Sequence, residues 1–163
     1  VGWMALLFGQ AVLAARGRIQ AHMTLGKYGG PALGTAVVLA GSLILYQQIT
    51  AVVAKDLLSW AEWPKILLGT MQAWFGLLGF AVLMGLGLRD RRRPAAHKRY
   101  MTLATIMLVP AAINRMDYLA NTIGIPILVA PLLAYDLYTE GRLHWATLVG
   151  AGLLGVKFVV AFL

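Results

Sequence analysis

All three histidines of the chain stand in short arginine-containing turns, each directly before an apolar stretch. The turns read Gly17-Arg18-Ile19-Gln20-Ala21-His22, Arg93-Pro94-Ala95-Ala96-His97 and Gly141-Arg142-Leu143-His144. Imidazoles at one membrane depth on adjacent helices can bind a metal ion or the axial positions of a haem iron. A neighbouring arginine can pair with a haem propionate and helps to keep the imidazole neutral. The candidate cofactor site, with haem b as the cofactor considered, comprises His22, His97, His144, Arg18, Arg93 and Arg142.

A structural interpretation of the same turns stays open beside this one. Arginine and histidine are both tolerated at a membrane interface, where they meet water and lipid phosphates. Three loops of a small protein can also share a composition by chance. In that case the histidines point separately into water or lipid headgroups, and no metal or haem lies between them.

A second group of polar residues stands at the far ends of two apolar stretches. Arg115 either extends to the membrane boundary or pairs with Glu62 or Asp56 of the facing loop. Alternatively, the group lines a pocket for a quinone headgroup or a small solute. Its members are Asn114, Arg115 and Asp117 at one end and Tyr46 and Gln48 at the other.

Motifs of enzyme chemistry are absent from the sequence. It has no Ser/His/Asp grouping with supporting spacing, no His-Glu-x-x-His and no cysteine. Asp136 and Glu140 are four residues apart, but they fall at an expected loop, where solvation explains them. We therefore expect a protein that is not an enzyme.

The amino-acid composition indicates whether the chain lies in water or in a membrane. The chain has 163 residues, of which 60% are hydrophobic and 12% are charged, and its mean hydropathy is +0.76. A soluble domain carries roughly 25% charged residues, so this chain lacks the polar surface that a globule in water needs. Soluble enzymes and freely diffusing nucleic-acid-binding proteins are thereby excluded, and a membrane protein is predicted.

Apolar stretches bounded by charge predict an all-α, polytopic transmembrane bundle of about six helices in three hairpins. We treat it as a single transmembrane domain over 1–163. The first stretch is short and lacks an initiating Met, and the last has no polar stop, so both ends are expected to be trimmed. The expected helices cover 2–15, 31–54, 66–88, 100–120, 123–138 and 145–163.

The distribution of Lys and Arg predicts the orientation of the bundle. The loop at 89–99 carries six cations against one Asp, and Arg16, Arg18 and Lys27 follow the first stretch. Because Lys and Arg are retained on the cytoplasmic side, the loops at 16–30, 89–99 and 139–144 are predicted to face the cytoplasm. The basic 89–99 loop is also expected to contact anionic lipids. It interleaves no aromatic residues, so no nucleic-acid partner is expected.

Glycines on two of the expected helices predict close packing of helix backbones. Small residues allow such approach, and van der Waals contact drives helix association in lipid. These glycines are Gly76, Gly79, Gly85 and Gly87 on the third stretch and Gly150, Gly152 and Gly155 on the sixth.

Two blocks of the chain resemble a family of uncharacterised multi-pass bacterial inner-membrane proteins. The run from Arg91 to Thr105, with Arg115 further on, is similar to that family's RRRPxxHKRLMLLAT…R core. Residues 131–148 resemble its LLAYDL…GRxHPATL segment, with Trp145 where proline is usual. The first loop, around His22, Leu25 and Gly26, is more weakly similar to the family's HxxLG opening, so the resemblance covers about residues 16–150. It implies a bacterial, non-secreted, polytopic protein and implies no reaction. It directs attention to His22, His97, Arg115, Asp136 and His144.

These observations favour an integral inner-membrane protein that serves as an accessory or structural subunit beside larger membrane partners. The alternative is a haem- or metal-binding electron-transfer protein that uses the histidines. A second alternative is a small-solute or proton carrier, because internal repeats are common in transporters.

Overall fold

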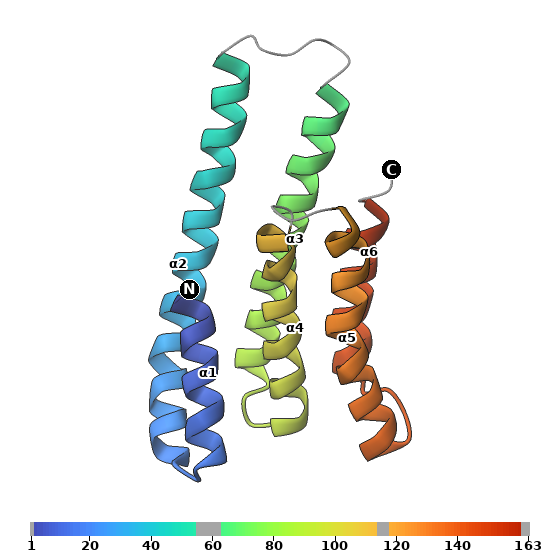
Figure 1. Cartoon of the computed structure of the whole chain (residues 1–163). Helices are drawn as coiled ribbons and strands as arrows, with labels where there is room; N and C mark the ends of the chain where they lie inside the picture. The colour runs from blue at the N-terminus through green and yellow to red at the C-terminus, as the bar shows by residue number, and fades with distance from the viewer. Residues whose placement is uncertain (1, 55–62, 114–117, 161–163) are drawn as a thin grey trace. The chain divides into compact units, whose positions relative to one another are not determined.

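Six α-helices make up the described part of the chain, which comprises residues 2–54, 63–113 and 118–160 of a computed structural model (Figure 1). No strand occurs among these residues. The all-α class and the six helices predicted from the sequence are confirmed. The helices are α1 (Gly2–Ala15), α2 (Ile19–Ala54), α3 (Trp63–Arg89), α4 (Pro94–Ile113), α5 (Tyr118–Glu140) and α6 (Trp145–Val160).

Three of the predicted turns are shorter than expected, because the helices extend into them. α2 begins at Ile19 and not at 31, α4 begins at Pro94 and not at 100, and α5 continues to Glu140. Prolines explain the first two of these errors. Pro31 lies inside α2, where it was expected to start the helix, whereas Pro94 takes the first helical position, at which its missing N–H is harmless. The expected loops at 16–30, 89–99 and 139–144 therefore contract to 16–18, 90–93 and 141–144.

Glycine closes two of these turns. Gly17 and Gly141 have φ angles of 68° and 66°, the left-handed region that glycine enters without a steric penalty. After α1, the N–H of Arg18 donates to the Leu13 carbonyl and the N–H of Gly17 to the Ala14 carbonyl. This pattern is a Schellman motif, which satisfies the last carbonyls of a helix. After α5, the N–H of Gly141 donates to the Leu137 carbonyl, so the two Gly-Arg turns share a left-handed glycine but differ in their hydrogen bonds.

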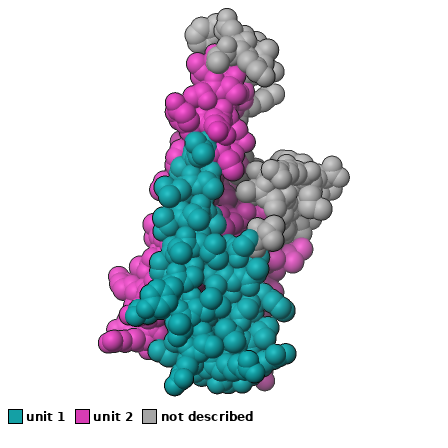
Figure 2. Space-filling view, turned by 90° about the vertical axis from the view of Figure 1, so that its left-hand side faces the viewer, with its two compact units in different colours: residues 1–43 teal, residues 44–163 magenta. Residues whose placement is uncertain are grey.

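The chain forms two compact units, residues 1–43 and residues 44–163, which we describe separately (Figure 2). In the first unit, α1 and the beginning of α2 form an antiparallel hairpin. One face of α1 is buried, through Trp3, Leu6 and Gln10. Gly29 of α2 faces Leu6, so the two helices approach closely at this point.

The second unit contains the end of α2 and the helices α3 to α6, with α4 in contact with α3, α5 and α6. Its core therefore centres on α4, whose Tyr100 and Leu103 are fully buried. Phe80 and Leu83 of α3 complete the core on one side. The α3–α4 turn and the α5–α6 turn lie at the same end of this unit (Figure 1). We call it the turn end.

Two helices of the described part, α2 and α3, are long and apolar enough to cross a membrane. The two candidate segments are Ile19–Val53 and Ile66–Arg89. Proline occurs inside α2, α4 and α5. Helices in membranes tolerate such prolines where neighbouring groups satisfy the freed backbone carbonyls.

Candidate functional site

Two of the three histidines occupy equivalent positions. His22 and His97 are the fourth residues of α2 and α4, and each follows the turn of its hairpin. The Nδ1 atom of His22 lies 3.1 Å from the Gln10 carbonyl oxygen, and that of His97 lies 2.7 Å from the Gly87 carbonyl oxygen. Because a carbonyl can only accept, Nδ1 carries the proton in both rings. In the neutral form, Nε2 then has a free lone pair.

His144 is placed differently. It precedes α6, and its Nδ1 accepts a hydrogen bond of 3.1 Å from the Ala146 backbone N–H. The imidazole therefore caps the helix, as a side-chain acceptor at this position does. Its ring also stacks on Trp145, with ring centroids 5.9 Å apart. The neutral ring thus carries its proton on Nε2, so this histidine lacks the free Nε2 lone pair of the other two.

The arginines that were grouped with the histidines are exposed. Arg18, Arg93 and Arg142 extend from the three turns. The backbone carbonyls of Arg18 and Arg93 accept the N–H groups of His22 and His97, which are early bonds of α2 and α4. Among the described residues, no group of three or more His, Asp or Glu could hold a metal ion.

The second predicted group of polar residues is described only in part. Tyr46 of α2 is 64% exposed. Gln48 lines an open, largely apolar hollow of about 450 Å³ between the end of α2 and the beginning of α3, together with Thr70. The other three members, Asn114, Arg115 and Asp117, lie outside the described residues.

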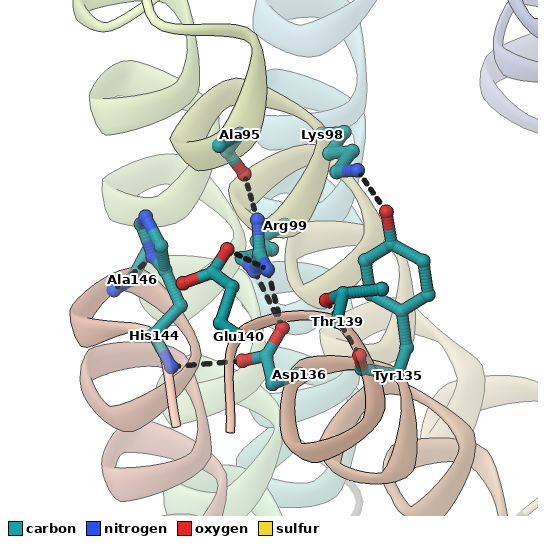
Figure 3. Close-up of polar contacts among 9 residues, drawn as sticks. All are labelled: Ala95, Lys98, Arg99, Tyr135, Asp136, Thr139, Glu140, His144 and Ala146. Carbon is teal, nitrogen blue, oxygen red and sulfur yellow. Dashed lines mark hydrogen bonds and ion pairs between the residues drawn. The ribbon is translucent and has the colours of Figure 1, made fainter. Parts of the chain in front are cut away.

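A buried ion pair at the turn end of the second unit is the main polar feature of the described chain (Figure 3). Arg99, in the second turn of α4, is 1% exposed, and Asp136, near the end of α5, is 0% exposed. The Nε and Nη2 atoms of Arg99 lie 2.7 and 2.6 Å from Oδ1 of Asp136. Hydrogen bonds between two charged groups are short and strong, so this pair holds α4 against α5.

Further partners complete the cluster that we call the Arg99 cluster, which consists of Arg99, Asp136 and Glu140. Nη2 of Arg99 donates to Oε1 of Glu140 at 2.7 Å, and Nη1 donates to the Ala95 carbonyl at 2.8 Å. The backbone N–H of His144 donates to Oδ2 of Asp136 at 3.0 Å. Both carboxylate oxygens of Asp136 are therefore occupied. The cluster joins α4, α5 and the residue that caps α6. Its hydrogen-bonding groups are used to hold these elements together, which suits a structural role better than proton transfer.

An aromatic contact and an exposed polar pair surround this cluster. The rings of Tyr100 and Trp145 meet edge to face at a centroid distance of 5.4 Å, which brings the beginnings of α4 and α6 together. On the other side, Nζ of Lys98 donates to the Tyr135 hydroxyl at 2.6 Å, and the same ammonium lies 4.5 Å from the centre of that ring. Figure 3 shows this pair beside the Arg99 cluster.

A second buried cation lies deeper in this unit. Nζ of Lys157, on α6, donates to the Met107 carbonyl of α4 at 3.2 Å. Gly76 of α3 provides the space, because a Cβ atom at that position would lie 2.6 Å from Nζ. Lys157 thus ties α6 to α4 across a glycine of α3.

Sequence reasoning missed the Arg99 cluster because each member had an ordinary explanation in a loop. Arg99 was counted with the basic 89–99 loop, and Asp136 and Glu140 were expected to be solvated. The structure contradicts this for Arg99 and Asp136, which are buried because α4 starts earlier and α5 ends later than predicted. Glu140 pairs with Arg99 but stays partly exposed, with 33% of its side chain accessible. The sequence contains a usable signal: Asp136 and Glu140, four residues apart, share a helix face if the helix continues to Glu140.

Comparisons with protein families, with curated proteins and with solved structures find no match to this chain.

Proposed function

We propose that this chain is a multi-pass protein of the bacterial inner membrane that serves as a non-enzymatic structural or accessory subunit of a membrane complex. The observation that carries the proposal is the distribution of polar and apolar groups. Charged side chains lie inside the second unit, where they hold helices together, while large apolar side chains lie on the outside of the helices. This arrangement suits a protein whose surroundings are lipid or apolar partners.

The exposed apolar side chains occur along several helices. Large apolar side chains exposed in this number suit contact with a protein or with lipid. Representative exposed residues are Leu39 and Leu43 of α2, Leu67, Leu78 and Val82 of α3, Leu137 of α5 and Leu148 of α6.

The contacts of the buried charged residues support a role in holding the helices together. The carboxylate of Asp136 and the guanidinium of Arg99 use their hydrogen-bonding groups on each other and on neighbouring backbone. A general acid or base needs a hydrogen-bonding position that faces a substrate. The Arg99 cluster offers such a position only at Glu140, whose side chain is 33% exposed.

The orientation yields the first prediction. A reporter fused after Arg93 is expected to lie in the cytoplasm and one fused at Ser59 on the opposite side, because Lys and Arg in short loops are retained inside. Paired fusions to green fluorescent protein and to alkaline phosphatase measure the two locations. A fusion after Arg142 is the matched control, since the α5–α6 turn shares an end with the α3–α4 turn. Phosphatase activity after Arg93 would contradict the orientation.

The subunit role yields the second prediction. The chain, tagged and expressed at its natural level, should leave the membrane in mild detergent as part of a larger assembly with defined partner proteins. Native gel electrophoresis and mass spectrometry of the purified sample measure this. Migration as a single detergent-bound chain would contradict a subunit role.

A haem-binding electron-transfer role is the second candidate, and one observation favours it. His22 and His97 both donate Nδ1–H to a backbone carbonyl, which is how metal-bound histidines are commonly oriented. Each ring thereby keeps its Nε2 lone pair available for a metal ion. The sample purified for the native gel decides between the candidates, because a Soret band with split visible bands would replace the subunit role by haem chemistry.

A further inference from the structure

We propose that the turn end of the second unit carries a binding site for the headgroup of an anionic phospholipid. The site consists of the arginines at 91–93, Lys98, Tyr135, Tyr138 and Arg142. The inference rests on the proposed membrane location and deepens it, because it names the lipid class and the residues that bind it.

The first argument is uncompensated charge. The arginines at 91–93, Lys98 and Arg142 are all exposed. The described carboxylates at this end are already engaged: Asp90 lies 3.5 Å from Nε of Arg89, and Asp136 and Glu140 bind Arg99. Within the described ranges, no carboxylate forms an ion pair with the exposed cations. An anion from outside the chain is therefore their natural partner.

The second argument is the direction of the hydrogen bonds at Lys98 and Tyr135. The ammonium is only a donor, so the Tyr135 hydroxyl must accept from it and is free to donate its own hydrogen elsewhere. The ammonium retains two further N–H groups. The pair thus presents donors that can bind a phosphate oxygen. The Arg99 guanidinium lies 5.6 Å from the Tyr135 ring, but its charge is taken up by Asp136 and Glu140, so Lys98 is the cation that this pair offers to an anion.

The third argument selects a lipid over a soluble anion. Tyr138 lies three residues after Tyr135, on the same side of α5, and is 92% exposed. Tyrosine and tryptophan concentrate at the level of lipid headgroups, where one end of the side chain is apolar and the other is wet. Leu128, seven residues before Tyr135 on the same side of α5 and 39% exposed, suits the acyl region. A phosphate joined to a glycerol and acyl chains matches this combination of cations, phenols and apolar surface.

The test compares lipids on the purified full chain. In detergent, added phosphatidylglycerol should raise the thermal unfolding temperature, whereas phosphatidylcholine and inorganic phosphate should not. Native mass spectrometry then measures how many phosphatidylglycerol molecules stay bound. Lys98→Met should weaken this binding roughly tenfold, because a hydrogen bond to a charged group is lost. Tyr135→Phe keeps the ring and the fold but removes the hydroxyl, and it should also weaken the binding of phosphatidylglycerol.

Lys27→Met is the matched control. Lys27 is also an exposed lysine over a tyrosine ring, 5.0 Å from the centre of Tyr28, but it lies in the first unit. An equal loss of lipid in Lys27→Met and Lys98→Met would overturn the site, because it would show a general charge effect. Equal stabilisation by inorganic phosphate would overturn the choice of a lipid.

Failure of this inference can be told apart from failure of the proposed function. Membrane fractionation of the unaltered chain tests the location independently. A chain in the membrane fraction with no preference for phosphatidylglycerol refutes the lipid site alone. A chain in the soluble fraction refutes the membrane location, and the lipid site with it.

Discussion

Replacing Arg99 by methionine is expected to lower the free energy of unfolding by about 3–5 kcal/mol. The substitution preserves much of the side-chain volume but removes the charge that faces Asp136, whose carboxylate is 0% exposed. The His144 N–H and the Thr147 hydroxyl would then remain beside it, and both of these donors are uncharged. Removing one partner of a buried ion pair strongly lowers stability, because the other charge stays buried without compensation. Denaturant titration of the purified chain in detergent, followed by circular dichroism, measures the loss.

The double variant separates the ion pair from simple packing. Arg99→Met combined with Asp136→Leu should recover most of the lost stability, since apolar residues of similar volume often replace a buried pair without loss. Arg92→Met is the matched control: the Arg92 side chain is exposed and forms no ion pair with a described carboxylate. Surface substitutions away from such contacts usually change stability by less than about 0.5 kcal/mol, so this variant should be nearly neutral. Similar losses in Arg92→Met and Arg99→Met would refute the buried cluster as a stabilising feature.

The contrast between these two arginines shows the limit of prediction from sequence. Both belong to one basic run, and hydropathy treats them alike. Their difference arises because α4 begins at Pro94, which places Arg99 in its second turn, facing α5. The predicted start of α4 depends on how Pro94 is interpreted, since proline is common both just outside a helix and at its first position. The partner, 37 residues further along the chain, follows only from the packing of α5 against α4.

The helices themselves were predictable because each contains an apolar stretch bounded by charge or by a turn. α1 has the predicted bounds, and α3 differs from them by three residues at its start and one at its end. α2 was predicted too short because residues 19–30 are not strongly apolar. There, tertiary packing decides: Gly26 faces the Gln10 side chain, and Gly29 faces Leu6. Packing against a neighbouring helix commonly overrides local preference.

The histidine turns illustrate the same limit in the candidate site. Composition groups His22, His97 and His144 together, whereas the hydrogen bonds divide them. The distinction depends on whether Nδ1 meets a carbonyl or an N–H, and spacing alone does not reveal it. His22 and His97 lie inside the first turns of their helices, but His144 precedes α6. A helix boundary that differs by a few residues therefore changes which nitrogen each ring can offer to a ligand.

The glycines were predicted as one class of packing residues, and the structure divides them into two. A Cβ atom added at Gly76, Gly79, Gly87 or Gly150 would press on a neighbouring helix. At Gly85, Gly152 and Gly155, nothing lies within 4 Å of such an atom. Sequence does not distinguish the classes because glycine has no side chain to indicate direction. Gly150 and Gly152 belong to different classes and lie two residues apart on α6, so they form a matched pair for substitution.

Gly150→Ala is expected to lower the free energy of unfolding by about 1–3 kcal/mol, the usual penalty of overpacking. The new Cβ would overlap the side chain of Leu103, including its Cβ atom at 3.0 Å. Leu103 is fully buried in α4, and its Cβ cannot move away without the helix, so α4 and α6 must separate. Thermal and denaturant unfolding in detergent measure the change.

Gly152→Ala is expected to change stability in the opposite direction, by up to about 1 kcal/mol, because alanine favours a helix interior over glycine and the added methyl meets open space. A Leu103→Ala background then tests the cause. If contact with Leu103 is responsible, Gly150→Ala should lose most of its effect in that background, since coupled neighbours are not additive. Equal effects of Gly150→Ala with and without Leu103 would place the strain elsewhere. A loss at Gly152 as large as that at Gly150 would contradict the packing of α6 against α4 through this face.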